Sequence, residues 1–166
     1  MGGALCTVVA AHAQVDALVL AAPYFRVTYR WYYLFPPETW ATLARPVVRW
    51  LHKSNRFIQV NRDEVKDKIV SYRWTPLRGT RPLIEIGSRA RSPQVLKTVT
   101  CPVLLLHSHL DNAASPKAAA EAFRSIGSSS KRVVWLETSN HILFWDRERD
   151  QVADEIVTFL ASLQTR

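Results

Sequence analysis

Cysteine, glycine and long apolar runs are all scarce in this sequence. The two cysteines, Cys6 and Cys101, provide no disulfide framework, which favours a reducing compartment. The five glycines form no phosphate-binding loop, and no zinc-ligand spacing is present. No apolar run approaches the roughly 20 residues that a membrane-spanning helix needs. The apolar start imitates a signal peptide but lacks its positively charged region. We therefore expect a cytoplasmic protein without a cofactor or bound metal.

Acidic residues are outnumbered by basic ones. The chain has 22 Lys or Arg against 14 Asp or Glu, a formal net charge of +8. The imbalance lies in residues 24–100, which carry 15 basic and five acidic residues. A basic block of this kind is compatible with binding to nucleic acid or anionic lipid. No RNA-binding aromatic motif or zinc finger accompanies it. We interpret it as a solvated surface and expect no nucleic-acid partner.

Three apolar segments have the length and composition of buried parallel strands. They are residues 15–21, 101–107 and 133–136. Helical patterns lie between and around them, at residues 2–13, 82–92, 116–124 and 147–163. Ser115, followed by Pro116, is a typical helix start. This alternation predicts an α/β protein, and 166 residues suffice for one domain.

Residues 24–81 differ in character from the rest of the chain. Most of the aromatic residues lie there, among scattered arginines, and Pro36-Pro37 interrupts the segment. Apolar spacing predicts a helix over 38–52 and a shorter one over 63–72. Because the strand pattern resumes only at Pro102, we interpret 24–81 as a cap or lid insertion. Residues 1–23 and 82–166 then form the α/β core.

Two residues with catalytic chemistry follow successive strands. Asp111 comes after the second strand, and His141 after the third. In open α/β sheets, sites form at the carboxyl ends of strands. A carboxylate that orients a histidine is two-thirds of a hydrolytic triad. The order of elements therefore predicts a site containing Asp111 and His141.

Both turns resemble those of a known superfamily. Residues 107–116 resemble the H-G-x-x-D acid turn of the α/β hydrolases, with Ser108 in place of glycine. Residues 139–146 resemble the S-x-H-x-x-x-x-D turn. The tail is similar to the final helix of the carboxylesterase and monoacylglycerol-lipase branch, the serine-aminopeptidase-like hydrolases. The resemblance implies the C-terminal part of an α/β-hydrolase fold, with about three parallel strands, flanking helices and a helical cap insertion.

The resemblance also implies the roles of the site residues. Asp111 would be the triad acid and His141 the general base. The nucleophile of this superfamily lies in a G-x-S-x-G elbow. The opening residues, Met-Gly-Gly-Ala-Leu, look like the half of that elbow that follows the serine. The nucleophile is therefore expected immediately before Met1, outside this chain. Cys6, Ser108 and Ser139 are poorly placed to replace it.

These observations predict the C-terminal portion of a serine ester hydrolase that is inactive alone. Its substrate would be a small ester or a lipid if the upstream segment is present. The main alternative is a non-catalytic hydrolase-like binding protein or subunit, so enzyme activity of this chain stays open. A further alternative is that His107, His109 and Asp111 bind a metal, because their H-x-H-x-D spacing resembles that of metallo-β-lactamase-like hydrolases. That pattern requires a histidine at the next position, where this chain has Asn112. Strand 15–21 would present an open edge for self-association.

Overall fold

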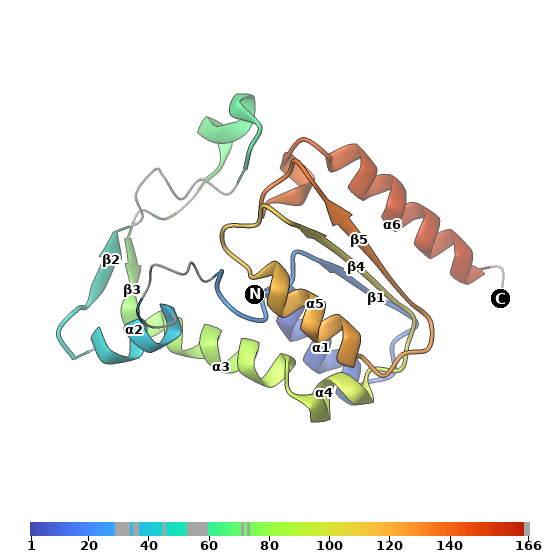
Figure 1. Ribbon diagram of the computed structural model, residues 1–166, viewed down its shortest axis with the longest axis horizontal. Coiled ribbons are helices and arrows are strands. Elements are labelled where there is room, and N and C mark those ends of the chain that lie inside the picture. Colours follow the sequence, from blue (N-terminus) through green and yellow to red (C-terminus); the bar gives the residue numbers. More distant parts are fainter. Residues whose placement is uncertain are drawn as a thin grey trace.

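A three-stranded parallel sheet forms the centre of the computed structural model (Figure 1). Its order is β1 (Leu18–Ala21), β4 (Val103–Ser108) and β5 (Lys131–Leu136). The predicted parallel strands are thus confirmed, although β1 begins three residues later than the apolar run. The structure describes residues 1–28, 34, 37–44, 46–52, 60–70, 72 and 74–164.

Helices cover both faces of the sheet (Figure 1). On one side lie α1 (Gly2–His12), α4 (Pro93–Thr98) and α5 (Pro116–Ser125), with α3 (Thr80–Ala90) packed on α1. On the other side lies α6 (Arg149–Gln164). Val103 and Leu105 of β4 belong to the first apolar cluster, and Leu104 and Leu106 to the second. A central strand buried on both faces explains the unbroken apolar run in the sequence.

The predicted helices of the core are present with small shifts at their ends. The Ser115 side chain caps α5 by accepting a hydrogen bond from the amide of Ala118 at 3.2 Å. The final helix begins at Arg149, after a short 3-10 turn η4 (Leu143–Trp145). None of the helices in the described part of the chain is both long and apolar enough to cross a membrane.

Residues 24–81 contain short elements rather than two full helices. They are α2 (Pro37–Ala44), β2 (Trp50–His52), η2 (Asp63–Lys68), β3 (Trp74–Pro76) and η3 (Leu77–Gly79). The predicted helix over 38–52 is wrong beyond Ala44, because Pro46 lacks an amide donor and disfavours a helical residue before it. Residues 53–59 lie outside the described residues.

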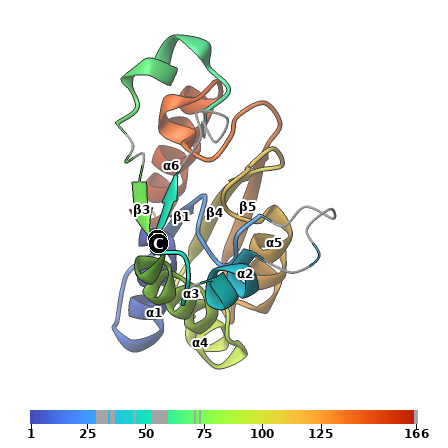
Figure 2. The same ribbon diagram turned by 90° about the vertical axis from the view of Figure 1, so that its left-hand side faces the viewer.

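The strands of this segment pair with each other and not with the central sheet. β2 and β3 form a separate antiparallel pair. The views in Figures 1 and 2 both place η2 at the end of the molecule where α6 begins. The division into core and cap stays a prediction.

Close packing at Gly127 gives a first test of the fold. A Cβ atom at this position would lie 2.1 Å from the carbonyl oxygen of Lys97, which is backbone and cannot rotate away. We expect Gly127→Ala to lower the free energy of unfolding by about 3 kcal/mol, the upper end for overpacking. The measurement is urea unfolding followed by circular dichroism.

Gly2→Ala is the matched control, because a Cβ atom at Gly2 has no neighbour within 4 Å. It should leave the urea midpoint unchanged or raise it slightly. Equal midpoints for the two variants would contradict the close packing of the loop after α5 against α4.

Candidate active site

The parallel pairing of β4 and β5 places their following turns at one edge of the sheet. His107 lies opposite Trp135 and Ser108 opposite Leu136 in the register. The structure brings Asp111 and His141 together there, with 2.8 Å between Asp111 Oδ2 and His141 Nδ1. The Asp111 side chain is fully buried, whereas 24% of the His141 side chain is exposed. The imidazole is thus anchored on its inner side and accessible from outside.

The second oxygen of Asp111 is held by its own turn. Oδ1 accepts hydrogen bonds from the amides of Ala113 at 2.8 Å and Ala114 at 2.7 Å. The Thr28 hydroxyl donates to the Asp111 carbonyl at 2.9 Å. Val27 forms an isolated antiparallel bridge to Ala114. The start of the 24–81 segment therefore lies against the acid turn and helps to fix the carboxylate.

His107 is a second imidazole beside the same carboxylate. Its side chain is fully buried, with Nε2 at 3.1 Å from the Ala114 carbonyl and 3.3 Å from Asp111 Oδ2. Burial lowers the pKa of His107, so the ring is neutral at neutral pH. A neutral ring that faces two acceptors carries its proton on Nε2. His107 is thereby a hydrogen-bond donor to the acid turn.

Two carboxylates satisfy the amides of the histidine turn. Buried Asp146 accepts from the amide of Asn140 at 2.7 Å and of Arg147 at 2.9 Å. Glu148 accepts from three consecutive amides, those of residues 137–139, at 2.7–3.0 Å. Burial would raise the pKa of Glu148, but the hydrogen bonds from Ser139 and these amides lower it to about 2. The turn that presents His141 is therefore held by hydrogen bonds to two acidic side chains.

The serines of the two turns are engaged in local structure. The buried Ser108 hydroxyl donates to the Ser139 carbonyl and accepts from the Leu110 amide at 3.0 Å. The Ser139 hydroxyl accepts from the Glu148 amide at 3.1 Å. Both hydroxyls thus link backbone groups of the two turns.

The three side chains of the metal alternative do not converge on one point. His109 stacks on Trp135, with 4.7 Å between ring centroids, and lies 3.6 Å from Glu137. His107 instead faces Asp111 and Ala114. No group of three His, Cys, Asp or Glu side chains in the described ranges could hold a metal ion.

The beginning of α1 lies at the same edge as the Asp111–His141 pair. A Cβ atom on Gly3 would be 2.9 Å from Cα of Pro23, so the helix starts directly against the residues that follow β1. Figure 1 places the N-terminus in this region. Ala22 reaches Pro23 through a φ of 44°, which residues other than glycine rarely adopt. Such strained backbone is common beside functional sites.

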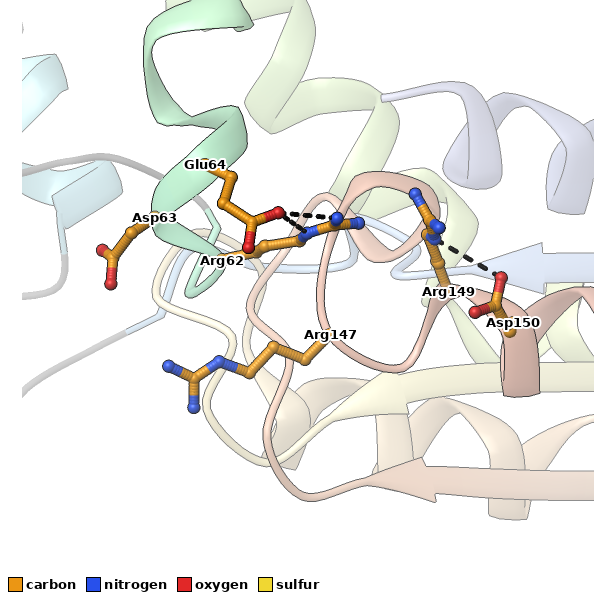
Figure 3. Close-up of a pocket in the computed structure, with 6 residues that line it drawn as sticks. All are labelled: Arg62, Asp63, Glu64, Arg147, Arg149 and Asp150. Carbon is orange, nitrogen blue, oxygen red and sulfur yellow. Dashed lines mark hydrogen bonds and ion pairs between the residues drawn. The ribbon is translucent and has the colours of Figure 1, made fainter.

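A hollow of about 470 Å³ lies beside the histidine turn and is lined by charged residues (Figure 3). Arg62 pairs with Glu64 at 2.7 Å, and Arg149 with Asp150 at 3.3 Å. Arg147 points away from both pairs (Figure 3). The lining contains three basic and three acidic residues, so its charges cancel. The hollow marks the junction between η2 and the start of α6 rather than an anion site.

The sequence indicates Asp111 and His141 as candidate site residues, but it does not indicate the residues that position them. Asp146 and Glu148 stand in the motif and tail that carry the resemblance, yet their amide contacts depend on how the chain turns. No sequence pattern points to Thr28 or Asn140, because their hydrogen-bond partners Asp111 and Asn112 lie 83 and 28 residues away in the chain. Only the folded chain brings such residues together.

The low pKa of Glu148 makes stability depend on pH. Its pKa falls from 4.5 to about 2 on folding, so the ionised form stabilises the fold above about pH 4.5. That contribution is lost as pH falls from about 4.5 to about 2. We expect Glu148→Gln to melt at a lower temperature than the native chain at pH 7, with the difference shrinking towards pH 2.

Glu121→Gln, on the exposed side of α5, removes the same charge without removing amide contacts. It should melt like the native chain across this pH range. Melting followed by circular dichroism at several pH values separates the variants. A pH-independent deficit in Glu148→Gln would count against an ionised Glu148 holding the turn.

Comparisons with known proteins agree with this geometry. The family model for serine aminopeptidase, S33, matches residues 1–148. A carboxylesterase of Bacillus subtilis (strain 168) is 19% identical over 117 residues, which are 70% of this chain and 47% of the relative. The chain therefore spans about half of that curated relative.

Solved structures share the fold over nearly the whole chain. A structure from work on the metagenome-derived lipolytic enzymes LipS and LipT is similar with a TM-score of 0.80 and 24% identity, covering 100% of this chain and 62% of the other. A monoacylglycerol lipase of Paleococcus ferrophilus has a TM-score of 0.77 and 14% identity, with 97% and 65% covered. The resemblance drawn from the two turns is thus confirmed, and the chain belongs to the S33 serine aminopeptidase-like family of α/β hydrolases.

Proposed function

We propose that this chain supplies the acid and the general base of a serine ester hydrolase. The observation that carries the proposal is the 2.8 Å hydrogen bond between buried Asp111 and the partly exposed His141. Asp111 would keep the His141 proton on Nδ1, leaving Nε2 to take the proton of a serine hydroxyl. His141 would then give that proton to the leaving alcohol, and a water molecule would release the acyl group by the same route.

The nucleophile is proposed to come from residues that precede Met1 in a longer protein. Support comes from α1, which begins against Pro23 at the edge that carries the Asp111–His141 pair. A serine on the strand-to-helix turn before such a helix has its hydroxyl exposed at the top of the sheet. Removing one triad member leaves only about 10³–10⁴-fold acceleration over water. The 166 residues alone are therefore proposed to be inactive.

The proposed substrate is a carboxylic ester with an apolar acyl or alcohol group. The similar proteins include a carboxylesterase, lipolytic enzymes and a monoacylglycerol lipase. Exposed aromatic residues of the 24–81 segment, such as Trp50 and Trp74, suit an apolar group. The segment is proposed as the cap over the ester.

An ester assay tests the proposal directly. The 166-residue chain should release p-nitrophenol from p-nitrophenyl butyrate no faster than the buffer does. Extending the chain upstream, in the reading frame of Met1, should restore turnover if that frame encodes Gly-x-Ser. His141→Ala in the extended protein should then lower kcat by about 10⁴ or more.

Two outcomes would contradict the proposal. Turnover by the 166 residues alone that His141→Ala abolishes would show that this chain has its own nucleophile. A stop codon directly upstream of Met1 would remove the longer enzyme. The alternative would then be a non-catalytic hydrolase-like binding protein.

The open edge of β1 leads to a separate proposal about the chain expressed alone. The amides of Leu18 and Ala22 donate towards β4, so those of Val19 and Ala21 point to the other side. Among the described residues no strand pairs with that side. Unpaired edges of this kind recruit other strands. We propose that two copies of the isolated chain associate through β1.

Analytical ultracentrifugation measures this association. The isolated chain should sediment as a dimer or larger species. Val19→Pro removes one outward donor without removing a bond to β4 and should shift the chain towards the monomer. A native chain that stays monomeric at 100 μM, about the upper range of such measurements, would contradict the proposal.

A further inference from the structure

Asn140 bridges the two turns that carry the proposed acid and base. It immediately precedes His141, and its side chain is buried. Its Oδ1 accepts from the Asn112 amide at 3.1 Å and from the His141 amide at 2.9 Å. Two backbone N–H groups point at this atom, so it must be the oxygen of the side-chain amide. The turns of Asp111 and His141 are therefore joined by a link that does not involve the imidazole.

The same side chain also contacts the 24–81 segment. Asn140 Nδ2 donates to Asn61 Oδ1 at 3.2 Å, and Asn61 Nδ2 donates to the Thr138 carbonyl at 2.9 Å. The amides of Asn61 and Asn140 donate to the same oxygen of buried Asp146, at 2.8 and 2.7 Å. Asn61 is thus held at three points on the histidine turn.

The ion pairs near Asn61 do not join the 24–81 segment to the histidine turn, whereas the hydrogen bonds of Asn61 do. The neighbouring ion pairs, Arg62–Glu64 and Arg149–Asp150, are each formed within one element and have exposed partners (Figure 3). Exposed pairs of this kind contribute little to holding two segments together. The hydrogen bonds of Asn61 with Asp146 and Asn140 instead join the residues just before η2 to the histidine turn, and both of these partners are buried.

We propose that Asn140 is a positioning residue, which sets the separation of Asp111 and His141 and couples it to the seating of Asn61. The inference rests on the proposed ester-hydrolase function for its purpose. A general base works only if Nδ1 keeps its proton and donates it to the carboxylate, while Nε2 faces the serine. Asn140 fixes the backbone on both sides of that hydrogen bond. A displacement of Asn61 would be transmitted to His141 through the same amide group.

The His141 Nδ1 proton reports on this geometry without any turnover. In the 166-residue chain labelled with ¹⁵N-histidine, a proton held between Nδ1 and Asp111 should give a protected, downfield NMR signal. His141→Gln removes this signal and so identifies it, while the Nε2 proton of His107, which also faces Asp111, is retained. Asn140→Ala should speed exchange of this proton with water at least tenfold, because both turns lose their common acceptor.

Three further variants separate positioning from general stability. Asn140→Asp keeps the bridging oxygen but loses the donor to Asn61, so it should speed exchange only two- to fivefold. Asn61→Ala leaves the bridge intact but removes the side-chain contact, and should speed exchange two- to fivefold. Thr138→Ala should have no effect, because its exposed side chain takes no part and its carbonyl is retained. Melting temperatures recorded in parallel show that each variant is folded.

The proposal is overturned if folded Asn140→Ala exchanges at the native rate, or if Asn140→Asp exchanges as fast as Asn140→Ala. If Asn140→Ala does not fold, native-like exchange in Asn61→Ala overturns it. None of these readings depends on a nucleophile. No turnover by the upstream-extended protein, with the expected exchange rates, would therefore count against the proposed function. Turnover by the extended protein, with native-rate exchange in Asn140→Ala, would count against the role of Asn140.

Discussion

The parallel pairing of β4 with β5 is the constraint on which the rest of the structure depends. It places the ends of two strands side by side, so the turns after them meet at one edge of the sheet. Asp111 and His141 are 30 residues apart in the chain and 2.8 Å apart in space for this reason. β4 is buried on both faces by the helices that cover the sheet.

The polar groups of the two turns are satisfied by one another and by carboxylates. Asp111 accepts hydrogen bonds from two amides of its own turn, while Asp146 and Glu148 accept hydrogen bonds from amides around His141. A turn without regular secondary structure would otherwise leave these donors unpaired, at a cost comparable to a lost hydrogen bond each. The result is a rigid support for the His141 imidazole, which is itself partly exposed.

The 24–81 segment reaches the site at two places. Thr28 contacts the carbonyl of Asp111 at its start, and Asn61 contacts the histidine turn near its middle. Hydrogen bonds to the carbonyls of Asp111 and Thr138 attach the segment to the backbone of both turns of the candidate site. The physical basis is a small number of hydrogen bonds with buried partners, each of which is costly to leave unmade.

The sequence by itself determined the three strands of the central sheet, most helices, the order of these elements and the two residues of the candidate site. These follow from local patterns, because a buried strand needs an apolar run and a helix start needs a cap such as Ser115. Only the tertiary structure decided the extended strand at 50–52, the short 3-10 turn at 63–68, and the partners of Thr28, Asn61 and Asn140. β2 exists because it pairs with β3, and Asn140 matters because three segments meet at it. Pairings between distant residues leave no periodic trace in the chain, so folding alone creates them.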